Sequence, residues 1–156
     1  MTAFRCVPIA TSIAERFRAT GRDDRGNALR RVVAEGRGEP CRHCLREASA
    51  GETVLLGSYD LPRPRGIYWT PSPIFVHADA CPAFGEPDMI PEIVRGRLVS
   101  VRAYDSDDQC LYDLGHAGDG DGVDAPLARA LADERAAFVN IHTAKPGCLL
   151  CRVERG

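Results

Sequence analysis

Glycine and proline interrupt this chain so often that long regular elements have little room to form. Of the 156 residues, 15 are Gly and 11 are Pro. Together they make up about 17% of the chain, compared with roughly 12% in average proteins. Parallel strands need crossover connections of about a dozen residues or more, usually helical. The short segments therefore predict an α+β fold, mainly antiparallel sheet with one or two short helices, in a single compact domain over residues 1–156.

Short apolar and β-branched segments between these breaks are the predicted strands. They cover residues 4–9, 31–35, 53–59, 73–77, 97–104, 110–114, 137–142 and 148–153. The segments 97–104 and 110–114 flank an acidic turn, which predicts a hairpin. Residues 78–91 contain too many prolines for a regular element.

Two short helices are predicted, one from Thr11 and one from Asp124. Asp124 is a typical N-cap residue, and a proline and apolar side chains follow it. We expect residues 1–30 to hold an N-terminal strand and a polar, mobile loop at 21–27. Residues 31–155 then form the core.

Charge and hydropathy exclude several classes of partner. Lys and Arg number 20 and Asp and Glu number 22, so the chain lacks the positive excess typical of general nucleic-acid binding. No apolar run approaches the ~18 residues of a membrane span, and we expect no secretory signal. A cytoplasmic protein whose partner is a small molecule or another protein is predicted. Only Lys145 is a lysine, which coding bias explains.

Seven cysteines carry the most chemical information. They are Cys6, Cys41, Cys44, Cys81, Cys110, Cys148 and Cys151. Because seven is odd and no secretory signal is expected, a disulfide framework is a poor explanation. Cys41 and Cys44 form a C-x-x-C pair directly after Pro40, and this spacing lets a tight turn present two thiolates to one zinc ion.

One candidate pair to complete such a site is His77 and Cys81. They lie four residues apart at the end of a predicted strand, so one turn of chain brings both side chains to the same side. Cys41, Cys44, His77 and Cys81 together supply three thiolates and one imidazole, a set that suits zinc. The competing interpretation is a hydrogen-bonded core histidine and a buried cysteine, without metal.

The other candidate pair is Cys148 and Cys151, a second C-x-x-C. Residues three apart in a strand point to opposite faces, so both would ligate only if Gly147 bends the chain. We expect Leu149, Cys151 and Val153 to share one face and to lie in the core, where a free cysteine behaves as a small apolar group.

Further residues carry chemistry if the protein is an enzyme, which the sequence leaves open. With only three protein ligands, a zinc-bound water fills the fourth position and Glu52 or His142 acts as base in a hydrolytic or lyase-type reaction. His142 and Cys148 face each other across the last predicted hairpin as a candidate nucleophile pair. Cys41 and Cys44 also resemble the C-x-x-C of disulfide oxidoreductases.

Several separated motifs occur in an order that resembles a known family. They are Pro40-Cys-Arg-His-Cys-Leu45, Gly51-Glu52 with Leu55-Leu56 and Tyr59, Pro73-Ile-Phe-Val-His-Ala78 with Cys81, and Gly147-Cys148 leading to Arg152-Val-Glu-Arg155. Over about residues 30–155 the chain is similar to a bacterial family, numbered 1203 among the domains of unknown function. The resemblance implies a small single-domain bacterial protein without an assigned activity.

The resemblance also bears on the site residues. The family pattern runs through the set Cys41, Cys44, His77 and Cys81, and through Cys148, and so favours the first ligand set. Family members often carry an arginine after the histidine of the last hairpin, whereas this chain has Thr143.

The leading hypothesis is a zinc-site-stabilised binding or interaction module, because four protein ligands close the coordination shell. The alternative is a zinc-dependent or Cys/His-dependent enzyme that acts on a small molecule. The third hypothesis is a thiol redox protein that uses Cys41 and Cys44.

Overall fold

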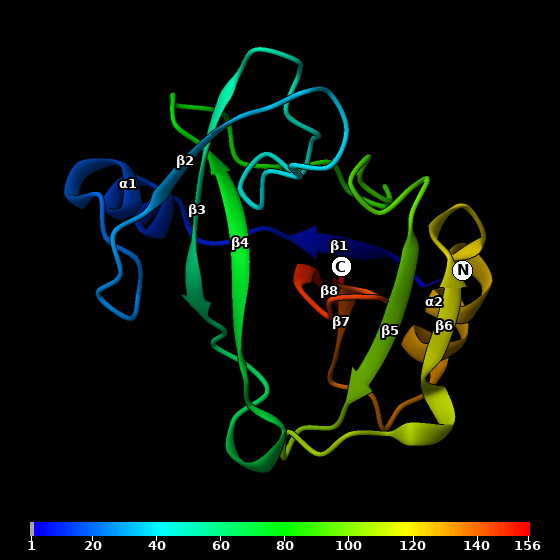
Figure 1. The fold of residues 1–156 in the computed structure, drawn as a ribbon. Coiled ribbons are helices and arrows are strands. Elements are labelled where there is room, and N and C mark those ends of the chain that lie inside the picture. Colours follow the sequence, from blue (N-terminus) through cyan, green and yellow to red (C-terminus); the bar gives the residue numbers. More distant parts are fainter. Residues whose placement is uncertain (1) are drawn as a thin grey trace.

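Two antiparallel sheets form the framework of the protein (Figure 1). The computed structural model describes residues 2–156. Its elements are β1 Phe4–Val7, α1 Thr11–Thr20, β2 Arg30–Val33, β3 Thr53–Asp60, β4 Pro71–His77, β5 Leu98–Tyr104, β6 His116–Asp119, α2 Asp124–Ala132, β7 Phe138–Thr143 and β8 Leu149–Arg155. The larger sheet has the strand order β1-β8-β7-β5-β6 and the smaller sheet β2-β3-β4. All strand pairs in them are antiparallel, so the predicted α+β fold is confirmed.

Each helix covers a different sheet, which gives the protein two main apolar cores. Leu127, Ala130 and Leu131 of α2 pack on the five-stranded sheet. Ala14 and Phe17 of α1 pack on the three-stranded sheet. In Figure 1 the two helices accordingly lie on opposite sides of the molecule. No helix within residues 2–156 is long and apolar enough to cross a membrane.

The predicted hairpin between 97–104 and 110–114 is wrong in its second strand. β5 pairs instead with β6, and Cys110 makes only an isolated bridge to Tyr104. Residues 112–114 form a 3-10 turn that places Leu114 in the larger core. Burial of this leucine bends the chain away from the strand direction before β6 begins.

The start of α2 also differs from the prediction. Val123, not Asp124, holds the N-cap position. Asp124 lies in the first helical turn, where its carboxylate accepts a hydrogen bond from Arg95 at 2.6 Å. A carboxylate in the first turn is favoured by the helix dipole.

A β-bulge between β7 and β8 changes the predicted strand faces. Ile141 pairs with Cys151 and His142 pairs with Leu149, so Leu150 is the extra residue. Cys151 lies in the larger core as predicted, whereas Leu149 turns toward the core of the smaller sheet. The bulge therefore lets β8 contribute to both cores.

Asp23 anchors the polar loop after α1 to the smaller sheet. Its carboxylate is buried and accepts hydrogen bonds from the N–H groups of Arg25, Asn27 and Ser58, as well as from the Asn27 side chain. Burial alone would raise the pKa of Asp23, but the hydrogen bonds, led by that from Ser58, outweigh burial and lower the pKa.

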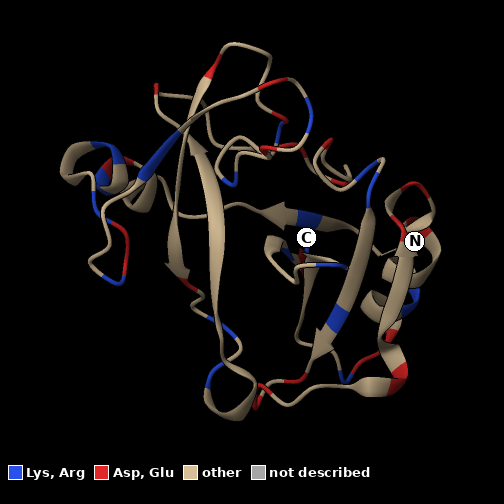
Figure 2. Ribbon diagram, in the orientation of Figure 1, with Lys and Arg blue, Asp and Glu red and all other residues tan. Residues whose placement is uncertain are grey.

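Ion pairs connect distant parts of the chain. Arg25 pairs with Asp60 at 2.9 Å, and Arg97 pairs with the buried carboxylate of Glu47. Figure 2 shows that basic and acidic residues are spread over both sheets and their connections. Opposite charges are therefore mixed over the fold.

We predict that Asp23→Ala lowers the free energy of unfolding by about 2–3 kcal/mol, because it leaves buried N–H groups without an acceptor. For a protein of this size the melting temperature then falls by about 4–12 °C. The pKa of Asp23 is lowered in the folded state, so its contribution is present above the unfolded pKa of about 3.9 and is lost as pH falls through the folded value. Thermal denaturation at several pH values measures both effects.

The control is Asp107→Ala, which removes an exposed carboxylate that accepts no hydrogen bond from another described residue. An equal loss of stability in both variants would contradict the anchoring role of Asp23.

Candidate metal centre

The turn over residues 40–47 presents Cys41 and Cys44 side by side. The Cys41 N–H bonds to the Arg46 carbonyl at 2.9 Å, and the Leu45 N–H bonds to the Cys41 carbonyl at 3.0 Å. Leu45 adopts a left-handed backbone with φ of 56°, which an L-residue tolerates poorly. Its side chain is completely buried, so apolar burial offsets the strain. The backbone N–H group of His77 donates to the Cys41 sulfur at 3.3 Å.

Four potential ligands from three segments converge next to this turn. His77 is the last residue of β4, and Cys81 follows in the irregular segment after it. One ligating atom from each of Cys41, Cys44, His77 and Cys81 lies within 4.8 Å of the others. The first three residues are buried and Cys81 is partly exposed. The structure thus brings together the four residues that the sequence singled out.

Two separations within the cluster match those around a tetrahedral ion. Zinc with sulfur at ~2.3 Å and nitrogen at ~2.0 Å requires sulfur–sulfur separations of about 3.8 Å and sulfur–nitrogen separations of about 3.5 Å. Cys41 Sγ lies 3.9 Å from Cys81 Sγ, and Cys44 Sγ lies 3.5 Å from His77 Nδ1. Both measured edges of the cluster therefore fit one zinc-sized ion.

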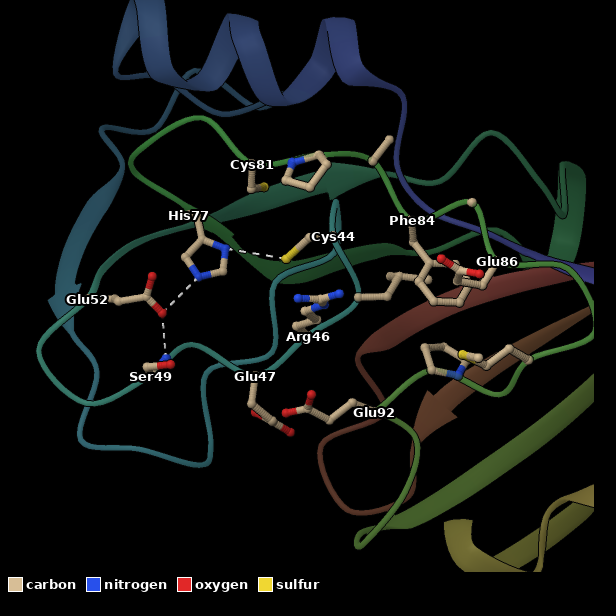
Figure 3. Close-up of a pocket in the computed structure, with 16 residues that line it drawn as sticks. Cys44, Arg46, Glu47, Ser49, Glu52, His77, Cys81, Phe84, Glu86 and Glu92 are labelled. Carbon is tan, nitrogen blue, oxygen red and sulfur yellow. Dashed lines mark hydrogen bonds and ion pairs between the residues drawn. The ribbon is translucent and has the colours of Figure 1, made fainter.

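Glu52 fixes the orientation of His77 (Figure 3). Its Oε1 lies 3.3 Å from His77 Nε2 and also accepts a hydrogen bond from the Ser49 N–H at 2.6 Å. With its proton on Nε2, the ring offers the lone pair of Nδ1 to the cluster. The hydrogen bond from Ser49 first, and His77 second, keep the pKa of Glu52 below its ordinary value although burial opposes them. A carboxylate behind a ligating histidine is a common support of metal sites.

Helix α1 and the turn itself support Cys81. Arg18 Nη2 lies 3.4 Å from Cys81 Sγ, and the Nε of the same arginine donates to the His77 carbonyl at 3.0 Å. His43 Nδ1 lies 3.3 Å from Cys81 Sγ, while its Nε2 bonds to Thr11 Oγ1 at 2.9 Å. Thr11 and Arg18 lie outside the C-x-x-C and H-x3-C motifs, and His43 occupies a variable position of the first, so no spacing in the sequence indicates these contacts.

Ionisation of one thiol in the cluster disfavours ionisation of the other two. Hydrogen bonds from Cys44 and Cys81 lower the pKa of Cys41. The same hydrogen bonds to Cys41, together with burial, raise the pKa of Cys44 and of Cys81. One thiolate and two thiols are thus the favoured state of the cluster alone. A bound divalent ion would favour the ionised form of all three thiols, because it attracts each thiolate and offsets the repulsion between them.

The cluster lies in the wall of a cavity of about 620 Å³. Cys44, His77 and Cys81 line one side of it (Figure 3). The charged residues around the cavity are Arg46, Glu47, Glu52, Glu86 and Glu92. Acidic side chains therefore dominate the charge around this cavity.

The other candidate residues lie apart from the cluster. His142 is 3% exposed; its Nδ1 bonds to the Gly147 carbonyl at 2.9 Å and its Nε2 has no partner within residues 2–156. Burial lowers the pKa of His142 to about 4. Cys148 lines a different cavity, and no hydrogen bond joins it to His142 in the described chain. Cys151 lies in the larger core, where its hydrogen bond to Cys6 and its burial raise its pKa.

The buried arginine next to the cluster was not identified from the sequence. Arg42, between the two cysteines of the turn, is 3% exposed, and its burial lowers its pKa to about 10. Nothing in a chain rich in arginine distinguishes a buried guanidinium from an exposed one.

We predict that a thiol reagent labels Cys148 of the native protein and leaves Cys151 unmodified. Cys148 is partly exposed, whereas Cys151 is buried with a raised pKa, which lowers its thiolate fraction. Mass spectrometry of digested protein, before and after unfolding, measures the labelling. Equal protection of both cysteines would instead favour a shared site of the second C-x-x-C pair.

Comparison with known proteins gives one match. The model of a family described as "Protein of unknown function (DUF1203)" matches residues 38–155. No curated protein and no solved structure matches the chain. The matched range includes the whole turn, His77, Cys81 and the last two strands.

Proposed function

The chain belongs to the DUF1203 family, which has no assigned function, so we propose a function from the site itself. The protein is a binding module whose fold is stabilised by one zinc ion held by Cys41, Cys44, His77 and Cys81. The observation that carries this proposal is the spacing of the cluster, 3.9 Å between two sulfurs and 3.5 Å between sulfur and imidazole nitrogen.

The donor set supports zinc among the common metals. Three thiolates and one imidazole are soft and intermediate donors, which suit zinc and suit calcium or magnesium poorly. Zinc bound to three thiolates carries one net negative charge, and Arg18 lies against Cys81 at 3.4 Å. The neighbouring charge thus complements the proposed centre.

Four protein ligands favour a structural role over a catalytic one. A catalytic zinc keeps one position for water, whereas a complete set of four leaves none. The ion would tie the 40–47 turn to the end of β4 and to the segment after it, and through Arg18 and His43 to α1. An enzyme with only three of these ligands remains the alternative, with water in the fourth position beside Glu52.

We predict one zinc per chain in protein purified without added metal. Replacement of a ligand in Cys81→Ser weakens zinc binding at least tenfold and lowers thermal stability, since metal binding contributes folding free energy. Cys148→Ser, which removes a cysteine outside the cluster, retains zinc and stability. Elemental analysis and thermal denaturation of the three proteins measure this difference.

Cobalt substitution separates the structural site from the enzyme. Visible spectra of tetrahedral cobalt with three thiolates, unchanged by added anions, are expected for a closed shell. Spectra that change with anions at an open position favour the enzyme. Native protein without metal, with Cys41 and Cys44 freely reactive, contradicts both forms of the proposal.

We further predict that Glu52→Gln weakens zinc affinity about 10–100-fold, because the carboxylate orients and polarises His77. The matched control is Glu86→Gln, which neutralises another carboxylate of the same cavity that makes no hydrogen bond to a ligand. Competition with a chromophoric chelator measures both affinities. The same affinity in both variants would show that Glu52 does not support the site.

A further inference from the structure

A second cavity, of about 360 Å³, is lined in part by Pro40 and Arg42 of the 40–47 turn. It shares no lining residue with the cavity beside the cysteine cluster. Three basic side chains line it: Arg42 from the turn, Arg97 before β5, and Lys145 from the β7–β8 hairpin. No aspartate or glutamate in the described part of the chain lines this cavity. Its charge is thus opposite to that of the cavity beside the cysteine cluster.

Arg42 is a buried cation without a carboxylate partner. Its Nε donates to the Leu149 carbonyl and its Nη1 to the Pro40 carbonyl, both at 2.6 Å. Within residues 2–156, Nη2 makes no hydrogen bond, and no carboxylate forms an ion pair with the guanidinium. Buried charges in proteins are normally paired, because an unpaired one loses its hydration without compensation.

Neighbouring groups of the protein do not supply the missing anion. A thiolate–zinc centre is negative, but Arg18 already lies against its Cys81 sulfur. The Glu47 carboxylate pairs with Arg97. Glu39 lies between the lining residues Gly38 and Pro40, but its buried Oε2 makes no hydrogen bond to Arg42 or to any other residue within 2–156. The Nε of Arg97 is buried and has no partner among residues 2–156, so a second N–H donor is unsatisfied. Two arginines of one cavity therefore retain unused N–H donors.

Lys145 adds a third positive charge, at the exposed edge of the cavity. It is exposed, and it is the single lysine of the chain. Its hairpin is fixed to β5 by the hydrogen bond from the Ala144 N–H to the Leu98 carbonyl at 2.9 Å. The remaining wall is apolar and includes Phe75, Leu98 and Pro146.

We propose that this cavity binds a small organic oxyanion, a phosphate or carboxylate attached to a flat apolar body. The guanidinium of Arg42 and the amine of Lys145 hold the anionic group, because charge-assisted hydrogen bonds to oxyanions are strong. The apolar body lies against Phe75 and Pro146. The volume falls in the range of small-molecule sites. This inference does not rest on the zinc proposal.

The test uses phenyl phosphate, benzoate and inorganic phosphate as probes on the protein as purified, with its metal content measured first. Changes in backbone NMR resonances report binding and its location. We expect saturable binding of phenyl phosphate or benzoate with a Kd below about 1 mM, and shifts at residues 143–148. Comparison of these two probes distinguishes a phosphate from a carboxylate ligand. Inorganic phosphate, which lacks the apolar body, binds at least tenfold more weakly.

Matched variants locate the site. Lys145→Gln weakens binding about tenfold, as expected for the loss of one charge-assisted contact. Arg129→Gln removes one exposed positive charge on α2, outside the cavity, and leaves binding unchanged. Arg42→Met abolishes binding, and its thermal stability and metal content show whether the fold is retained.

Two outcomes overturn the proposal. One is the absence of saturable shifts with any of the three probes in folded protein. The other is equal weakening by Lys145→Gln and Arg129→Gln, which would indicate attraction by net charge alone. Because metal content is measured separately, loss of zinc with intact anion binding contradicts only the structural-zinc proposal.

Discussion

Four potential ligand atoms, from three buried residues and the partly exposed Cys81, lie within 4.8 Å of one another where several elements of the fold meet. Hydrogen bonds to Cys41 and burial raise the pKa values of Cys44 and Cys81, and repulsion by the Cys41 thiolate adds to both effects. A divalent ion turns the same arrangement into an attractive one. The smaller sheet, helix α1 and the last loop before β5 all meet at this point.

The side chains of the 40–47 turn line two separate cavities. Cys44 and Glu47 line the acidic cavity, whereas Arg42 lines the basic one. The backbone that positions the metal ligands therefore also positions a buried guanidinium. We infer that the proposed zinc ion stabilises one wall of the proposed anion site without touching the bound anion.

The predicted fold class is confirmed, and the four residues proposed as ligands lie close together in the structure. Both outcomes have identifiable physical reasons. Frequent Gly and Pro limit helices, and the C-x-x-C and H-x3-C spacings are local. The errors lie where tertiary packing overrides a local pattern: Leu114 turns into the core and ends the predicted strand, and a bulge separates the faces of Leu149 and Cys151. The burial of Arg42 could not be predicted, because segments distant in the sequence, such as Leu149, cover it.

The central claim is that one zinc ion binds Cys41, Cys44, His77 and Cys81 in a closed shell. X-ray absorption spectroscopy at the zinc edge of the purified protein tests it most directly. The account predicts three sulfur atoms at ~2.3 Å and one nitrogen atom at ~2.0 Å. A shell that contains an oxygen atom from water, or fewer than three sulfur atoms, would contradict it.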